Sequence, residues 1–312
     1  MKVVVIGGTG HIGTFLVPRL AKEGHQITVV SRQQHKPYVT SSEWEKIQWI
    51  NLDRTQMETE GKFGQAVADL SPDVVIDMIC FTVESARQLV SSLQDRAQHF
   101  LHCGTMWVHG YKKETPSEES HPRRPIGEYG IRKAAIEEYL LNQVDQRRLP
   151  VTILHPGHIV GPGWTPLNPQ GNFNRDVFAK LASGQEVILP NLGLETLHHV
   201  HADDVAAAFM QALTNKASAT GQSFHVLSDK ALTWRGYAEA IAEGCNQKAN
   251  LRFVPWDEFR TLVSEPDAQC TWDHLMHSTT GSIDKARRLL NYEPGYTSLE
   301  AIRESLAYQN RG

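Results

Sequence analysis

Runs of β-branched and other apolar residues alternate along this chain with segments whose apolar residues recur at helical spacing. Residues 1–6 form the first run, which is typical of a strand buried in a parallel sheet. In segment 11–23, Leu16, Leu20 and Ala21 fall on one helical face, and Gly24 suits a helix end. Residues 26–30 are a second apolar run, so the chain is predicted to open with a strand, a helix and a second, parallel strand.

The same alternation predicts the other elements of the chain. Strands are expected at residues 49–52, 73–79, 98–103, 151–154, 186–189 and 222–227. Helices are expected at residues 82–96, 128–144, 172–183, 203–213, 233–243, 282–290 and 298–308, with Thr82 and Thr233 as N-caps. This order indicates an α/β fold, a doubly wound parallel sheet with a smaller interleaved C-terminal region.

A glycine-rich turn separates the first strand from the first helix. Its glycines have the spacing GxxGxxG in place of the GxGxxG of the common dinucleotide pattern, and a tight strand–helix turn would need glycine as well. The position between a strand and a helix favours a nucleotide, because backbone N–H groups and the helix dipole there hold a pyrophosphate. The expected contacts of this dinucleotide are Gly7, Thr9, Gly10, His11, Ile12 and Gly13.

The residues after the second strand bear on the identity of the dinucleotide. NAD-binding chains usually carry an acidic residue there, whereas this chain has Ser31 and Arg32, and an arginine accommodates a 2′-phosphate. We therefore expect NADP as the cofactor, with NAD as the alternative. The alternative for Arg32 is that it is a solvated loop arginine without a role in binding. Asp53 and Pro156, which follow the third and sixth strands, are further expected cofactor contacts.

Tyr129 and Lys133 lie four residues apart and share a face of the predicted helix 128–144. A tyrosine with a pKa of ~10 is a poor base at neutral pH. A nearby ammonium and a positively charged nicotinamide ring lower that pKa. The pair therefore suits proton transfer to a substrate oxygen during hydride transfer, with Lys133 also reaching the nicotinamide ribose. Thr105, at the end of the fifth strand, is expected to hydrogen-bond that oxygen. The alternatives are that Tyr129 is an ordinary surface tyrosine and that Thr105 only caps the end of the strand.

Several motifs together resemble the extended short-chain dehydrogenase/reductases, the NAD-dependent epimerase/dehydratase group, over nearly the whole chain. They are the glycine turn, residues 105–110 with Thr105 at the catalytic hydroxyl, the Tyr129–Lys133 pair, and segments 155–162, 200–206 and 282–287. The resemblance implies a Rossmann sheet, with a dinucleotide-binding domain over residues 1–160 and a substrate-binding region over 161–312, parts of which return to the sheet. It also implies a homodimer through helices 82–96 and 128–144.

Two departures from the family pattern concern the substrate. Nucleotide-sugar members commonly carry an arginine just before the segment matching 200–206, and residues 194–199 contain none. His155 also stands where the resemblance expects an arginine. These departures favour a smaller, less anionic sugar or sugar-derived ketone over a UDP-sugar. The expected substrate-binding residues are Thr105, His155, His158 and Asn172.

The remaining composition narrows the class of protein. The chain has 312 residues with 40% hydrophobic and 21% charged residues, and its net charge of −4 gives no reason to expect nucleic acid binding. Four cysteines without CxxC spacing, no signal peptide and no long apolar stretch predict a cytoplasmic protein that does not bind membranes. Fifteen histidines include His155, His158, His198, His199 and His201, but their spacing does not indicate convergence, so no metal is expected.

These observations predict an NAD(P)-dependent oxidoreductase or epimerase that moves a hydride at a secondary alcohol or ketone carbon of a sugar or sugar-like substrate. Tyr129 is the expected general acid/base, Lys133 its partner and Thr105 the group that orients the substrate oxygen. The alternative is a cofactor-binding or RNA-associated protein of the same fold without catalysis, since chloroplast stem-loop RNA-binding proteins resemble this family too.

Overall fold

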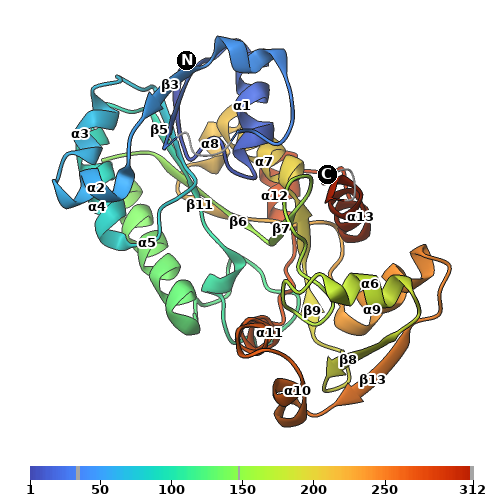
Figure 1. Ribbon diagram of the computed structural model, residues 1–312. Helices are drawn as coiled ribbons and strands as arrows, with labels where there is room; N and C mark the ends of the chain where they lie inside the picture. The colour runs from blue at the N-terminus through green and yellow to red at the C-terminus, as the bar shows by residue number, and fades with distance from the viewer. Residues whose placement is uncertain (33–35, 147, 310–312) are drawn as a thin grey trace.

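The computed structural model describes residues 1–32, 36–146 and 148–309, and its centre is a parallel sheet (Figure 1). Within these residues the sheet has seven strands in the order β11-β6-β5-β4-β1-β2-β3, with β1 in the middle. Because β1 is flanked by β4 and β2, successive strands were added on both sides of it, as in a doubly wound sheet. The strands are β1 (Lys2–Ile6), β2 (Gln26–Ser31), β3 (Gln48–Asn51), β4 (Val74–Asp77), β5 (His99–Cys103), β6 (Val151–Pro156) and β11 (Gln222–Val226).

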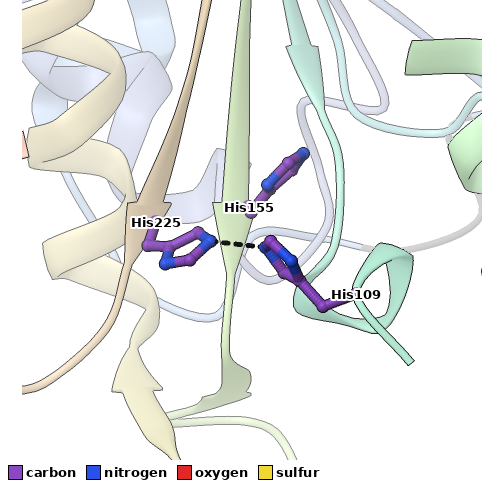
Figure 2. Close-up of side chains that lie close together, drawn as sticks. All are labelled: His109, His155 and His225. Carbon is purple, nitrogen blue, oxygen red and sulfur yellow. Dashed lines mark hydrogen bonds between the residues drawn. The ribbon is translucent and has the colours of Figure 1, made fainter. Parts of the chain in front are cut away.

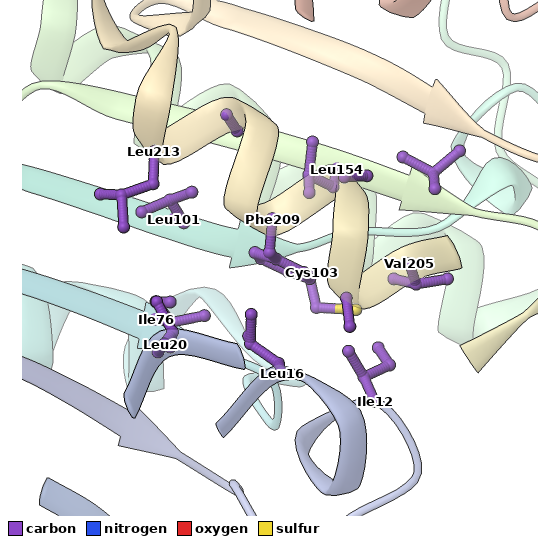
Figure 3. Close-up of a cluster of buried hydrophobic side chains, with 14 of the residues drawn as sticks. Ile12, Leu16, Leu20, Ile76, Leu101, Cys103, Leu154, Val205, Phe209 and Leu213 are labelled. Atoms are coloured by element: carbon purple, nitrogen blue, oxygen red, sulfur yellow. The ribbon is translucent and has the colours of Figure 1, made fainter. Parts of the chain in front are cut away.

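Helices cover both faces of this sheet. On one face, Leu16 and Phe209 pack with Ile76, Leu101 and other buried strand residues, as Figure 3 shows. The helices of this face are α1 (Gly13–Lys22), α7 (Ala202–Thr214), α8 (Lys216–Ala219) and α12 (Asp284–Leu290). The opposite face carries α3 (Phe63–Ala68), α4 (Val83–Leu93) and α5 (Gly127–Asp145), preceded by α2 (Arg54–Thr59). Strands with apolar residues on both faces need such double cover.

A smaller lobe lies beside the carboxyl ends of the strands, at the lower right of Figure 1. Its core is built around the fully buried Trp234 and Tyr237. Its strands are the parallel pair β8 (Glu186–Pro190) and β13 (Asn250–Val254) and the antiparallel pair β9 (Thr196–Leu197) and β12 (Leu232–Thr233). Its helices are α6 (Asp176–Ala182), α9 (Trp234–Gly244), α10 (Trp256–Leu262), α11 (Glu265–His277) and α13 (Ser298–Gln309).

Short elements join the lobe to the sheet. The parallel pair β7 (His158–Val160) and β10 (His199–His201) lies at this junction. The described residues also form two 3-10 helices, η1 (Ser42–Lys46) and η2 (Met106–Val108). Among the described residues, none of the helices is long and apolar enough to cross a membrane. Strand β11 and helix α7 come from the second half of the chain yet complete the sheet and its cover. The domain division at residue 160 and the homodimer through α4 and α5 stay predictions.

The predicted α/β fold with a doubly wound parallel sheet is confirmed. So are both N-caps, since the Thr82 hydroxyl accepts the N–H of Ser85 and the Thr233 hydroxyl accepts that of Gly236. The fourth strand ends at Asp77 instead of Ile79 because the Asp77 carboxylate accepts the N–H of Ile79 and turns the chain. The helix expected from residue 172 begins only at Asp176.

The structure also contains elements that the hydrophobic pattern did not predict. Strand β13 and helices α10 and α11 fill the segment 250–277, for which no element was expected. Helix α11 has a recognisable start, because the Ser264 side chain accepts the N–H of Asp267 and a proline lies in the first turn. This signal was present in the sequence, and α11 turns out to supply part of the functional cavity described next.

Candidate active site

A cavity of about 510 Å³ lies at the carboxyl ends of β1, β4, β5 and β6, between the sheet and the smaller lobe. We refer to it as the larger cavity. The glycine turn contributes Gly7, Gly10, His11 and Ile12 to its wall, and Thr105, Tyr129 and Lys133 line it together. Pro156 and His158, at the end of β6 and the start of β7, also line it. Ligands of open parallel sheets bind at this edge, because the loops that follow the strands converge there.

Tyr129 and Thr105 form a hydrogen-bonded pair inside the larger cavity. Tyr129 is in the first turn of α5, and its hydroxyl contacts the side chain of Thr105, the residue that caps η2. Although 42% of Tyr129 is exposed, burial of its hydroxyl raises the pKa to about 12, and the bond to Thr105 offsets only part of this rise. The sequence predicts a pKa lowered by Lys133 together with the nicotinamide ring, whereas in the protein by itself this pKa is raised. A lowered pKa has to come from the positive charge of an oxidised nicotinamide.

Lys133 is held by the backbone and not by Tyr129. Its ammonium donates hydrogen bonds of 2.9 Å to the carbonyl of Cys80 and 2.8 Å to that of Cys103, at the ends of β4 and β5. An ammonium has three donors, so one N–H remains for a ligand hydroxyl. Burial lowers the pKa of Lys133, while the side chain is 3% exposed at the cavity wall. The lysine is thus preorganised before any ligand arrives.

Aromatic and imidazole rings form part of the remaining wall of the larger cavity. Trp107 stacks on His277 at 3.9 Å between ring centroids and meets Tyr129 edge-on at 5.8 Å. Trp164 stacks on His11 at 5.0 Å, on the side of the glycine turn. His11 and Tyr129 were predicted site residues, but Trp164 and His277 were not, because the loop around residue 164 and α11 are far from the glycine turn in the chain. Lys133 is the single charged side chain in the lining described.

The histidines of this wall are neutral at physiological pH. Burial lowers the pKa of His11 to about 4 and that of His198 to about 4, and it also lowers the pKa of His158 and His274. Neutral imidazoles offer one donor and one acceptor each, which suits hydroxyl groups better than phosphates. The larger cavity therefore presents polar but mostly uncharged groups to a ligand.

A second cavity of about 320 Å³ continues along the same edge to the ends of β2 and β3. We refer to it as the smaller cavity. It shares Gly7, Gly10 and Ile79 with the larger cavity. The predicted cofactor contacts Thr9, Ser31, Arg32 and Asp53 all line it, although Asp53 also caps α2 by accepting the N–H of Gln56. Two connected cavities that meet at a glycine turn match the extended shape of a dinucleotide.

The glycine turn is shaped for close approach to an anion. Gly7 has φ of 83°, and a Cβ on Gly13 would lie 2.2 Å from the Gly8 carbonyl oxygen, so these two positions need glycine. Gly13 therefore allows the start of α1 to lie against Gly8 of the turn, and its predicted contact with the cofactor stays a prediction. Helix α1 begins without a side-chain cap and without an acidic residue in its first turn. Its positive dipole end suits an anion such as a pyrophosphate, although the N–H groups of residues 14–16 already bond to the carbonyls of Gly10 and Ile12.

A buried ion pair forms the floor of the smaller cavity. Arg54 donates to Asp77 at 2.8 Å and to Glu58 at 2.6 Å, and Asp77 is completely buried. Arg54 lines the smaller cavity, and its Nη2 has no hydrogen-bond partner among the described residues. The sequence did not indicate this pair, because Asp77 and its partner Arg54 lie 23 residues apart.

The structure does not bring two predicted substrate ligands into the larger cavity. His155 is fully buried behind Gly104, where its Nε2 lies 2.9 Å from the Glu137 carboxylate. Asn172 is fully buried as well, and its amide bonds to Asn168 and Thr271, which shapes the loop before α6. Neither residue is in the lining described for that cavity, whereas Thr105 and His158 are.

Known proteins similar to this chain include enzymes and one nucleic-acid-binding protein. A 2′-dehydrokanamycin reductase from Streptomyces kanamyceticus is 26% identical over 82% of this chain and 70% of its own length. The chloroplast stem-loop binding protein of 41 kDa b from Arabidopsis thaliana is 24% identical over 97% of this chain and 78% of its own length.

Solved structures repeat the same fold. A UDP-glucose 4-epimerase from Thermotoga maritima, solved with UDP-glucose, has a TM-score of 0.75 and 18% identity, with 100% of this chain and 99% of that chain covered. The sequence profile of the NAD dependent epimerase/dehydratase family matches residues 3–226. These residues span the sheet from β1 to β11 and include the glycine turn that the two cavities share. The chain belongs to the NAD dependent epimerase/dehydratase family.

Proposed function

We propose that this protein is an NADP-preferring oxidoreductase or epimerase that moves a hydride at a secondary alcohol or ketone carbon of a sugar or sugar-like substrate. The observation that carries the proposal is the convergence of Thr105, Tyr129 and Lys133 on one cavity whose floor is the glycine turn. Proton transfer and hydride transfer occur at neighbouring atoms of a carbinol, so the acid/base group and the dinucleotide site have to share a cavity.

The residues present fit a dinucleotide. The glycine turn and the uncapped start of α1 suit the pyrophosphate, and the smaller cavity suits the adenosine half. Arg32 at the rim of the smaller cavity supports the 2′-phosphate of NADP, while family membership by itself supports NAD or NADP. When bound, the nicotinamide supplies or accepts the hydride.

The protein's own groups then handle the oxygen of the substrate. In reduction, the Tyr129 hydroxyl donates its proton to the carbonyl oxygen, and Thr105 holds the same oxygen by a hydrogen bond. In oxidation, the tyrosinate accepts the proton of the alcohol. Lys133 stays on the carbonyls of Cys80 and Cys103 and directs its remaining N–H towards a ribose hydroxyl.

The charge of the larger cavity supports a substrate with few negative charges. With Lys133 as the charged side chain of the lining and neutral histidines around it, the cavity lacks the cation cluster that a sugar diphosphate needs. A neutral sugar, a deoxysugar ketone or an amino sugar satisfies the imidazole and hydroxyl groups by hydrogen bonds and the indole rings by stacking.

The test is a screen of sugars, nucleotide sugars and sugar ketones for turnover. Turnover is monitored by the absorbance of the nicotinamide, with NADPH or NADP as the cofactor. For any substrate found, Tyr129→Phe should lower kcat by about 10²–10⁴-fold, the usual contribution of a positioned acid/base, and leave NADPH affinity within about twofold. Tyr139→Phe is the matched control, because Tyr139 is on the same helix but packs against the apolar cluster beneath it and is not in the lining described for the larger cavity. Full turnover by Tyr129→Phe would contradict the proposal.

The similarity to the chloroplast stem-loop binding protein favours a second candidate, an RNA-associated role. The net charge of −4 argues against it, since nucleic acid binding draws most of its free energy from cationic contacts with phosphate. The same Tyr129→Phe variant separates the two roles, because removal of one phenol oxygen leaves binding of a stem-loop RNA unchanged in fluorescence anisotropy while it abolishes turnover.

A further inference from the structure

Three histidines from distant parts of the chain meet at the edge of the sheet next to the larger cavity. His155 on β6 is registered opposite His225 on β11, and His109 ends the 3-10 helix η2. Figure 2 shows the rings of His109 and His225 pointing towards each other, with the ring of His155 beside them and directed away from the pair. All three are buried, with at most 3% of His109 exposed, and one nitrogen from each lies within 4.8 Å of the others.

The contacts of His225 and His155 indicate which of their ring nitrogens are available to a ligand. The Nδ1 of His225 lies 3.1 Å from the Ser282 carbonyl, which only accepts, so Nδ1 carries the proton and Nε2 a lone pair. The Nε2 of His155 lies 2.9 Å from the Glu137 carboxylate, but neither ring nitrogen of His155 has a partner with hydrogen-bond geometry among the described residues.

Buried nitrogens without partners remain in this cluster. Nδ1 of His155 and Nδ1 of His109 have no hydrogen-bond partner among the described residues. The Nε2 atoms of His109 and His225 lie 2.7 Å apart, so His109 donates its proton to the lone pair of His225. Leaving a polar atom buried and unpaired costs free energy, and such atoms usually have a partner.

We infer that His109, His155 and His225 are the ligands of a divalent transition metal ion, zinc or an ion of similar preference. Imidazole nitrogens suit such ions, and the carbonyl of Ser282 and the carboxylate of Glu137 are the outer partners that metal-bound histidines typically have. Nitrogens at the usual Zn–N distance of a tetrahedral site are about 3.3 Å apart. When the ion binds, the Nε2 atoms of His109 and His225, now 2.7 Å apart, therefore separate slightly and the ring of His155 moves towards them. The proton on Nε2 of His109 moves to Nδ1 of the same ring.

A route from solvent leads to this cluster. A side pocket of about 230 Å³ is lined by His109 and by Ser117, whose buried hydroxyl oxygen also has no partner among the described residues. Two carboxylates contact residues of this cluster, since Glu119 accepts the backbone N–H of His225 at 2.7 Å and Glu137 lies 2.9 Å from the His155 ring. Arg123 balances part of this charge through its 2.8 Å bond to Glu137.

The metal site ties a segment near Thr105 to the sheet. Thr105 caps the start of η2 and His109 follows its end, so a metal at His109 fixes the element that carries the substrate-facing hydroxyl. It also joins the loop after residue 109 to β6 and β11, in addition to the hydrogen bonds that Glu119 and Arg123 of this loop form with β11. The ion therefore positions structure and takes no part in proton or hydride transfer.

The experiment titrates Co²⁺ into the full-length protein after dialysis against a chelator. We expect one equivalent of Co²⁺ to give the visible absorption of a tetrahedral site, Zn²⁺ to abolish that absorption, and either ion to raise Tm by about 3 °C at a hundredfold excess over Kd. His225→Asn keeps an N–H donor towards Ser282 but removes the ligand nitrogen. Its metal affinity should fall by more than about a hundredfold, since loss of an outer partner alone costs 10–100-fold.

The matched control is His99→Gln, which removes another buried imidazole of the sheet while it keeps a donor for the Thr152 hydroxyl. It should bind Co²⁺ as the unchanged protein does. If His225→Asn does not fold, as judged by circular dichroism, His109→Gln replaces it. Absence of stoichiometric Co²⁺ binding, or equal affinity in the His225 and His99 variants, would overturn the inference and leave a hydrogen-bonded histidine pair.

Discussion

The two cavities at the carboxyl edge of the sheet differ in how they present charge. The smaller cavity, at β1 to β3, has Arg32, Asp53 and Arg54 in its lining and a buried ion pair as its floor. The larger cavity, at β5 and β6, is lined by aromatic rings and neutral imidazoles with Lys133 as its charged side chain. The first is suited to hold an anionic cofactor in place, and the second is suited to move one proton.

This difference follows from where each cavity draws its residues. The smaller cavity is built from the first eighty or so residues, in loops that directly follow neighbouring strands. The larger cavity combines those loops with residues from β6, β9 and α11, which are brought together only when the smaller lobe packs against the sheet. Anchoring is therefore a local property of this chain, whereas the choice of substrate depends on the whole fold.

The largest effect is expected at the ion pair below the smaller cavity. Arg54→Met leaves Asp77 fully buried without its cation, so the free energy of unfolding should fall by about 3–5 kcal/mol. Urea unfolding measures it. Arg19→Met is the control, because the Arg19–Asp203 pair is partly exposed and should contribute less than about 1 kcal/mol. Equal losses in both variants would remove the contrast between the buried ion pair below the smaller cavity and a partly exposed one.

The next effect concerns the charge at the rim of the smaller cavity. If Arg32 binds a 2′-phosphate, Arg32→Ala removes a charged hydrogen bond of about 1.5–3 kcal/mol, which weakens NADPH binding roughly 10–100-fold and leaves NADH unchanged. Fluorescence titration with both cofactors measures the two affinities. Arg235→Ala, which removes an exposed arginine of the smaller lobe, should change neither. Parallel weakening of NADPH and NADH would argue for a general electrostatic role of Arg32.

The smallest effect is the pH dependence of the larger cavity. Because burial raises the pKa of Tyr129 to about 12, the phenol stays protonated near neutrality. The rate of reduction should therefore be flat from about pH 6 to 8, while the rate of oxidation rises by up to tenfold per pH unit as tyrosinate forms. Initial rates in both directions test this. A reduction rate that falls across this range would mean that bound cofactor brings the pKa close to neutral.

Much of the candidate site was predictable because its residues stand beside strong local signals. Thr105 and Arg32 follow apolar strands, Gly7 and Gly10 form the turn, and Lys133 lies one helical turn after Tyr129, so each position is set by its neighbours. Trp107 and His277 were missed as a stacked pair because 170 residues separate them. His155 was misplaced because a strand end offers two faces, and packing against Glu137 selected the buried one.

The sequence by itself determined the parallel sheet, the glycine turn and the acid/base helix, because strand burial, turn conformation and helical spacing are encoded within about ten residues of one another. Only the tertiary structure decided which imidazoles line the larger cavity and which gather at His109, His155 and His225. Those positions depend on the order of β5, β6 and β11 in the sheet and on the docking of α11, which result from burial of apolar surface across the whole chain.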